Sequence, residues 1–163
     1  ENIHHEGILR LTIAPAQNIP KSLQKKAEEY MHSLINEMDH VGVMTLELFD
    51  SSDELIVNEI APRVHNSGHW TIEGAQTSQF ENHIRAITNS PLGATSIRSS
   101  FNAMINIIGI QGQTSKVLET KNAHLHLYDK EERKERKLGH ITLTSNSMEE
   151  LNKSIDSLKE YLP

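Results

Sequence analysis

One segment of the chain holds more hydrogen-bonding side chains than a hydrophobic core requires. Residues 57–70 include two imidazoles, a carboxylate, a guanidinium, two primary amides and a hydroxyl. A guanidinium suits a phosphate or carboxylate, amides and hydroxyls can bind sugar hydroxyls or an anion, and an imidazole can donate or relay a proton. The candidate ligand-binding side chains are Arg63, His65, Asn66 and Ser67. They predict a site for a small anionic ligand, and the alternative is a polar loop around a packed Trp70.

Two acidic residues, Glu47 and Glu59, are expected to meet beside this segment. The apolar runs 41–49 and 55–61 are separated by a turn-forming connector, which predicts an antiparallel hairpin. In that hairpin the two carboxylates share a face and lie within about 5–8 Å of each other. Because they repel, a cation would stabilise them, and Mg²⁺ prefers carboxylate and phosphate oxygens. We therefore predict a Mg²⁺ site, to which a local bulge could add the Asn58 amide; the alternative is an edge strand with solvated acids.

A third group of charges lies in the mixed run 129–137, between two predicted strands. Such a run is usually a solvated hairpin. Lys130 and Arg136 could nevertheless reach back over a phosphate, and composition alone does not decide between the two interpretations.

The elements that must position these residues can be read from periodicity. A helix is predicted from Pro20 to Met38, because apolar residues recur there at three- and four-residue spacing after a helix-starting proline. Further strands are predicted at 7–15, 103–110, 123–128 and 139–144, and further helices at 77–88 and 147–161. The fold class is therefore α+β. A Ser-rich stretch ending at Ser100 suggests two parts, 1–98 and 99–163.

Composition limits the classes of partner. Sixteen basic and twenty-two acidic residues give a net charge of −6, which argues against a general nucleic-acid or membrane-surface binder. The apolar runs are too short to span a membrane. The chain has no cysteine, so it can form neither a disulfide nor a thiolate metal site, as is common for a cytoplasmic protein.

The run NEIAPRVHNSGHWT at 58–71, followed by TSQFE at 77–81, strongly resembles the 5-(carboxyamino)imidazole ribonucleotide synthetases of the ATP-grasp superfamily. The resemblance continues through 126–130 and 136–140 and spans essentially the whole chain. It implies the C-terminal portion of an ATP-grasp domain, an antiparallel sheet with flanking helices, followed by a small mixed β/α subdomain. These enzymes act in de novo purine biosynthesis and use ATP and bicarbonate to carboxylate the exocyclic amine of 5-aminoimidazole ribonucleotide, through carboxyphosphate.

The resemblance also implies a role for each candidate residue. Glu47 and Glu59 fall on the Mg²⁺-binding acids, and His4, Asn58 and Glu59 on positions near ATP. Arg63 and His65 fall on catalytic positions, which with Asn66 and Ser67 also contact the substrate. Lys130 and Arg136 match a clamp for the 5′-phosphate of the ribonucleotide.

Members of this family are roughly twice as long, so the resemblance implies that the chain is the C-terminal part of such a ligase and does not turn over alone. The complete enzyme is expected to be cytoplasmic and a homodimer. Two alternatives remain open. One is another ATP-grasp ligase with a different acceptor, such as the formyl-transferring glycinamide ribonucleotide enzyme. The other is a non-catalytic module that binds a phosphorylated metabolite or a metal.

Overall fold

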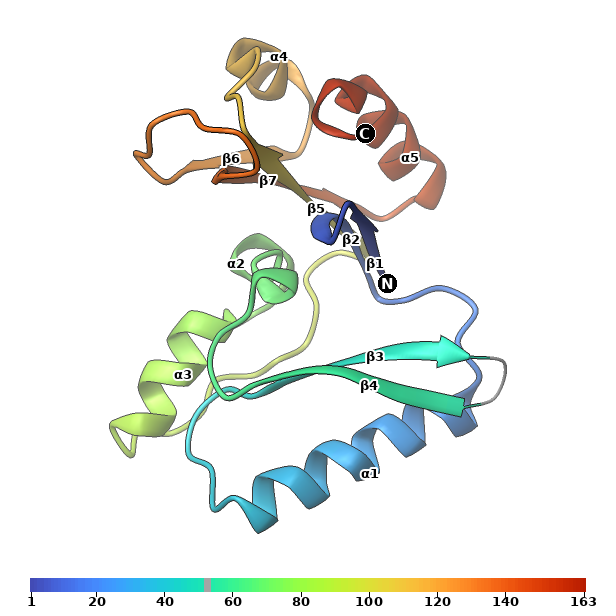
Figure 1. Ribbon diagram of the computed structural model, residues 1–163, viewed down its shortest axis with the longest axis vertical. Helices are drawn as coiled ribbons and strands as arrows, with labels where there is room; N and C mark the ends of the chain where they lie inside the picture. Colours follow the sequence, from blue (N-terminus) through green and yellow to red (C-terminus); the bar gives the residue numbers. More distant parts are fainter. Residues whose placement is uncertain (52–53) are drawn as a thin grey trace.

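Two antiparallel sheets form the frame of the protein (Figure 1), in a computed structural model that describes residues 1–51 and 54–163. The larger sheet has the strand order β1-β2-β5-β7-β6, and the smaller is the hairpin β3-β4. The strands are β1 (Asn2–His5), β2 (Ile8–Ala14), β3 (Thr45–Ser51), β4 (Glu54–Ala61), β5 (Phe101–Ile108), β6 (Ala123–Leu127) and β7 (Lys137–Ser145). The helices are α1 (Lys21–Glu37), α2 (Thr71–Gly74), α3 (Gln79–Ile87), α4 (Thr114–Glu119) and α5 (Met148–Ser157), with short 3₁₀ turns at Asn66–Gly68 and Lys159–Tyr161.

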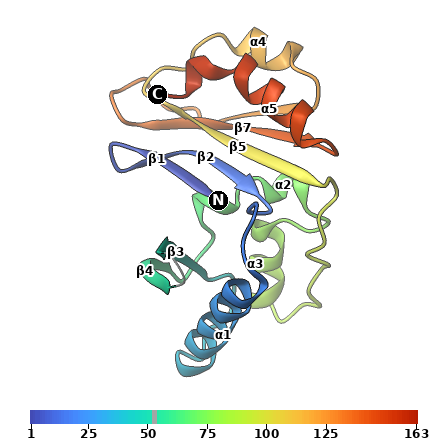
Figure 2. The same ribbon diagram turned by 90° about the vertical axis from the view of Figure 1, so that its right-hand side faces the viewer.

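The hydrophobic core lies between the larger sheet and helices α4 and α5, which cover one of its faces (Figure 2). Leu151, Ile155 and Leu158 recur at helical spacing and turn one side of the C-terminal segment toward the sheet. Ile105 and Ile141 pair across β5 and β7 and fill the centre of this core. Apolar burial on this scale stabilises the sheet that carries part of the candidate site.

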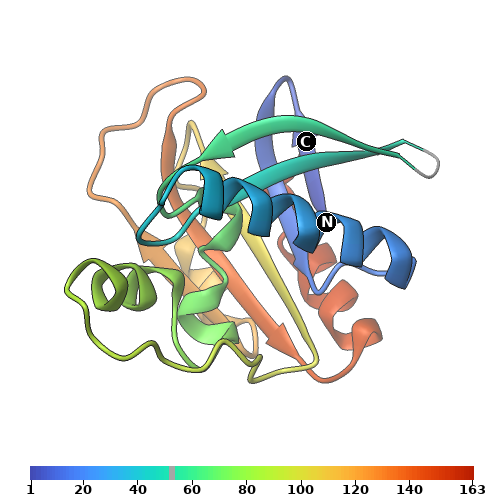
Figure 3. The same ribbon diagram turned by 90° about the horizontal axis from the view of Figure 1, so that it is seen from below.

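The opposite face of the larger sheet is polar and lies toward α2 and the β3-β4 hairpin. Its buried side chains include Asn102, Asn106, His140 and Thr142. Helix α1 lies on the far side of the hairpin, and both cross below the sheet (Figure 3). The site residues therefore lie between two layers, where polar side chains of the sheet meet those of the hairpin. None of the helices in the described ranges is long and apolar enough to cross a bilayer.

Several predictions from periodicity are confirmed. The helix after Pro20 is α1, with Pro20 as its N-cap residue, and the hairpin is β3-β4. The helix predicted at 77–88 is α3, which Ser78 caps by accepting a hydrogen bond from the Glu81 N–H. Residues 52 and 53 of the predicted connector lie outside the described residues. Strand β1 and helices α2 and α4 were not predicted, because each is too short to show a periodic pattern.

One boundary needs correction. The strand predicted from Val41 begins at Thr45. The hairpin leaves the side chains of Phe49, Ile56 and Val57 about half exposed. The division at 98/99 stays a prediction. Strand β2 pairs with β5, so the larger sheet takes strands from both sides of that position.

Candidate functional site

The two acids predicted to meet are directly opposite each other in the hairpin. Glu47 on β3 is the cross-strand partner of Glu59 on β4. The next pair is Leu48 with Val57, so a bulge leaves Asn58 without a partner. An extra residue in a strand turns its side chain away from the regular alternation. Asn58 Nδ2 thereby donates to Glu47 Oε2 at 3.3 Å, which confirms the prediction that a bulge could bring this amide to the acids.

His65 completes a group of three side chains that could hold a metal ion. One ligand atom from each of Glu47, Glu59 and His65 lies within 4.8 Å of the other two. His65 Nε2 is 3.9 Å from Glu59 Oε1, and Asn2 Nδ2 donates to Glu47 Oε1 at 2.8 Å. Glu47 is only 9% exposed. Two acids held this close in a partly buried position fit a divalent cation.

The hydrogen bonds of His65 restrict its role. The backbone N–H of Ser67 donates to Nδ1 at 3.4 Å, and the Ser67 hydroxyl lies 2.8 Å from the same atom. A ring nitrogen that accepts a hydrogen bond carries no proton, so the neutral ring carries its proton on Nε2. In that state Nε2 can donate to a carboxylate or an anion but cannot ligate a metal. The two carboxylates are therefore the better candidate ligands.

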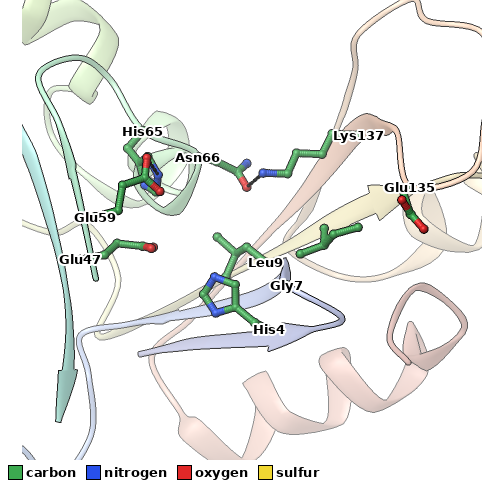
Figure 4. Close-up of a pocket in the computed structure, with 10 residues that line it drawn as sticks. His4, Gly7, Leu9, Glu47, Glu59, His65, Asn66, Glu135 and Lys137 are labelled. Atoms are coloured by element: carbon green, nitrogen blue, oxygen red, sulfur yellow. Dashed lines mark hydrogen bonds and ion pairs between the residues drawn. The ribbon is translucent and has the colours of Figure 1, made fainter. Parts of the chain in front are cut away.

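A pocket of about 200 Å³ opens beside these three residues (Figure 4). Its walls come from β1 and β2, from the hairpin, from the loop after β4 and from the start of β7. The lining residues are His4, Gly7, Ile8, Leu9, Glu47, Glu59, His65, Asn66, Glu135 and Lys137. His4 was predicted to lie near ATP, and the structure places it across the pocket from the acids. The size suits a few linked polar groups rather than a whole nucleotide.

Gln79, which sequence reasoning missed, fixes the turn that carries His65. Its Oε1 accepts the His65 N–H at 3.0 Å, while its Nε2 donates to the His65 carbonyl at 2.7 Å and to His69 Nδ1 at 2.9 Å. Every polar hydrogen of this side-chain amide is thus used. A Cβ on Gly68 would lie 2.6 Å from Gln79 Oε1, so a side chain there would displace this amide from its hydrogen bonds. The resemblance included the TSQFE run, but no sequence pattern indicated its contact with the turn.

Lys137 is the second residue that sequence reasoning missed. Its Nζ donates to Asn66 Oδ1 at 2.9 Å, inside the pocket (Figure 4). Burial lowers the pKa of Lys137 below its usual value of 10.5, and the nearby charges of Glu47 and Glu59 partly oppose that shift. The residues predicted from the same charged run were Lys130 and Arg136. Neither of these lines the pocket.

Four of the predicted residues do not line the pocket. Arg63 is exposed, with Nη1 donating to the Val64 carbonyl at 2.9 Å and Nη2 3.7 Å from Glu59 Oε1. Ser67 points to the ring of His65, as described above. The Lys130 ammonium lies over the Tyr128 ring, 5.3 Å from its centroid. Arg63, Ser67, Lys130 and Arg136 therefore remain predicted substrate contacts.

A stack of imidazoles supports the polar face of the sheet behind the pocket. The rings of His126 and His140 are 4.4 Å apart and nearly parallel, and those of His69 and His140 are 5.2 Å apart. His126 Nε2 is 2.8 Å from Glu73 Oε1, and Tyr128 Oη is 2.7 Å from His140 Nδ1. Burial lowers the pKa of His140 to about 3 and that of His69 to about 4. At neutral pH both rings are uncharged.

We expect the stability of this chain to fall as the pH drops from 6.5 toward 4. The pKa of His140 is lower in the folded state than the ordinary 6.5, so the unfolded state binds the extra proton. The contribution of this ring to the free energy of unfolding is fully present above pH 6.5. It falls on acidification by about 1.4 kcal/mol per pH unit. Denaturant unfolding at several pH values measures the slope. His140→Gln should reduce it, whereas His124→Gln, at an exposed position, should not; equal slopes in both variants would contradict the assignment.

Two family models match the chain, one on either side of the 81–101 connection. Residues 1–80 match the ATP-grasp domain, and residues 102–154 match the phosphoribosylaminoimidazole carboxylase C-terminal domain. The N5-carboxyaminoimidazole ribonucleotide synthase of Vibrio cholerae is 43% identical over 99% of this chain, which covers 42% of that protein. The chain thus spans less than half the length of this relative.

Solved structures give the same result. The N5-carboxyaminoimidazole ribonucleotide synthetase of Thermus thermophilus matches with a TM-score of 0.94 and 50% identity, over 98% of this chain and 44% of that one. The Aspergillus clavatus N5-carboxyaminoimidazole synthase, solved with ADP and 5-aminoimidazole ribonucleotide, matches with a TM-score of 0.89 and 37% identity, over 98% of this chain and 45% of that one. With the paired acids and the pocket, these matches show that the chain belongs to the N5-carboxyaminoimidazole ribonucleotide synthase family of ATP-grasp ligases and corresponds to the C-terminal part of its members.

Proposed function

We propose that the chain is part of a ligase that carboxylates 5-aminoimidazole ribonucleotide with bicarbonate at the expense of ATP. The products are N5-carboxyaminoimidazole ribonucleotide, ADP and phosphate. The observation that carries the proposal is the opposition of Glu47 and Glu59 across the hairpin, beside a pocket that His65 and Asn66 also line. The complete enzyme is proposed to be a cytoplasmic homodimer.

The paired carboxylates serve the ATP end of this reaction. Glu47 and Glu59 would hold Mg²⁺, which neutralises the phosphate charge of ATP during transfer. Glu59, with Asn58 and His4, is the proposed contact to the nucleotide. The amide of Asn58 already donates to Glu47, so one side chain links the metal ligands to the nucleotide side. The A. clavatus relative was solved with ADP, which supports a nucleotide as a ligand of the complete enzyme.

The loop after β4 serves the bicarbonate and acceptor end. Bicarbonate attacks the γ-phosphorus of ATP, which forms a new P–O bond and releases ADP. The exocyclic amine then attacks the carboxyl carbon of carboxyphosphate, and the bond from that carbon to the phosphate oxygen breaks. His65 Nε2–H, fixed by Ser67 and Gln79, is placed to donate to an anionic oxygen, and Arg63 is the proposed second cation. Preorganised donors of this kind lower the cost of charge development.

The acceptor's 5′-phosphate is assigned to Lys130 and Arg136. Both belong to the connection between β6 and β7, and Tyr128 holds the Lys130 ammonium over its ring. Their position outside the pocket suits a phosphate that lies several bonds away from the reacting amine. Carboxyphosphate hydrolyses readily in water, so the residues that line the pocket must also limit access of solvent.

The decisive experiment measures ADP release by the longest natural polypeptide that contains this sequence. Mg²⁺-ATP and bicarbonate are supplied with and without 5-aminoimidazole ribonucleotide, and the ribonucleotide is expected to raise the rate at least tenfold. Glycinamide ribonucleotide with formate is the matched control acceptor. Stimulation by the control pair alone would favour the formyl-transferring alternative, and no stimulation by either would favour a binding module. Residues 1–163 alone are expected to bind ATP weakly and to show no turnover.

A further inference from the structure

Lys137 is a half-buried cation to which the proposed function assigns no role. It begins β7, and its side chain crosses the pocket toward Asn66, facing the side on which Glu47, Glu59 and His65 lie (Figure 4). It lines the pocket together with those acids, whereas Arg63, the other strong cation near them, does not. Glu47 and Glu59 are close enough for their charges to act on its ammonium. The lysine therefore belongs to the reacting end of the site.

The ammonium of Lys137 retains donors for a ligand. It carries three N–H groups. In the part of the chain that the structure describes, one hydrogen bond is formed by Nζ, to Asn66 Oδ1 at 2.9 Å. No ion pair within 4.0 Å is recorded for it among residues 1–51 and 54–163. Two donors of this half-buried ammonium therefore remain for an anion that enters the pocket.

A buried amide pair fixes the position of this lysine. Asn66 Nδ2 donates to Asn106 Oδ1 at 2.9 Å, and Asn106 Nδ2 donates back to Asn66 Oδ1 at 2.7 Å. Asn106 lies on β5, is 0% exposed, and also donates to the carbonyl of Leu9, a lining residue of the pocket. The Leu9 carbonyl accepts only from the nitrogen end of the Asn106 amide, and the reciprocal pair then fixes which end of the Asn66 amide is the oxygen. That oxygen is the acceptor for Lys137.

We infer that Lys137 binds an anionic oxygen of carboxyphosphate in the pocket, and that Asn106 positions it through Asn66. The inference rests on the proposed function. When the amine nitrogen bonds to the carboxyl carbon, the bond from that carbon to the bridging oxygen breaks. The electron pair of the broken bond stays on the phosphate oxygen, and the proton of the amine passes to the departing phosphate. Lys137 stabilises the negative charge on that phosphate. This role differs from that of Lys130 and Arg136, which hold the distant 5′-phosphate.

The test compares Lys137→Met with Lys134→Met in the complete enzyme. Methionine keeps most of the hydrocarbon chain and removes the charge. Lys134 lies in the same connection, with a side chain that is 88% exposed, and serves as the control. Lys137→Met is expected to lower kcat about 100-fold or more, as loss of one charge-stabilising donor typically does, with little change in the KM for the ribonucleotide. Lys130→Met should instead raise that KM.

Two further variants separate a chemical role from a structural one. Lys137→Arg keeps a cation and should recover part of the lost kcat, while Asn106→Leu should lower kcat with Lys137 still present and leave that KM unchanged. Thermal unfolding reports whether each variant folds. If Lys137→Met does not fold, the kcat of Lys137→Arg is the test of the inference. A normal kcat in Lys137→Met, or a change confined to KM, would overturn the inference. Absence of ribonucleotide-stimulated ADP release in the wild type would instead remove the proposed function itself.

Discussion

Replacing Glu59 by Gln is expected to abolish Mg²⁺-ATP-dependent turnover in the complete enzyme, with a fall in kcat of about 1,000-fold or more. The substitution is nearly isosteric but removes one of the two charges that face each other across the hairpin. The remaining carboxylate, Glu47, already accepts hydrogen bonds from Asn2 and Asn58, and it cannot replace the lost ligand. The measurement is ADP release as a function of Mg²⁺ concentration.

The control for this experiment is Glu54→Gln, an exposed acid at the start of the same strand. It should leave kcat and the Mg²⁺ dependence unchanged. Circular dichroism should show the same fold for both variants, because the Glu59 residue is exposed and makes no contact with the hydrophobic core. Activity near that of the wild type in Glu59→Gln would show that the metal assignment is wrong. If Glu59→Gln does not fold, Glu47→Gln tests the metal assignment in its place.

Gly139→Ala should be the most destabilising single-methyl change in the larger sheet. Gly139 lies on β7 between Leu127 of β6 and Ile107 of β5. A Cβ there would lie 2.2 Å from the backbone oxygen of His126, so one of the two strands must move. Because β7 lies inside the sheet and Gly139 is itself buried, we expect the free energy of unfolding to fall by about 3 kcal/mol. Chemical denaturation of the wild type and the variant measures the difference.

The matched control for this change is Gly7→Ala. Nothing lies within 4 Å of a Cβ at that position, although its φ of +75° disfavours any side chain. That change should cost about 1 kcal/mol through backbone conformation alone. Equal losses in the two variants would show that β6 and β7 can separate locally at no additional cost, contrary to the close contact in the structure.

The sequence predicted the parts of the site that depend on local geometry. Strand alternation and a hairpin were enough to place Glu47 opposite Glu59, and the bulge at Asn58 is a local feature of the same two strands. Pro20 marked the start of α1 for an equally local reason, since proline suits the first positions of a helix.

The sequence did not predict which residues of distant segments meet. Lys137 looked like one charge among many in a solvated connection. A bulge in β7 turns it into the pocket. Ile107 pairs with Gly139 and Ile108 with Lys137, so Leu138 has no partner on β5. The extra residue changes the alternation of side chains along β7. The Asn66–Asn106 pair likewise joins positions forty residues apart. A polar side chain buried on a central strand gives no sign, in one sequence, of which partner satisfies it.

The pairing of β2 with β5 has a consequence for the order in which the chain can fold. Leu11 of β2 meets Ile105 of β5, so more than ninety residues must be synthesised before this edge of the sheet can close. Among the described residues before 101, β1 and β2 pair only with each other, and a two-stranded ribbon alone is marginally stable in water. Contacts between such distant positions slow folding, because the intervening chain must be ordered before they form. The wall that β1 and β2 contribute to the pocket therefore meets the strands that carry Asn106 and Lys137 only after the ribosome has delivered them.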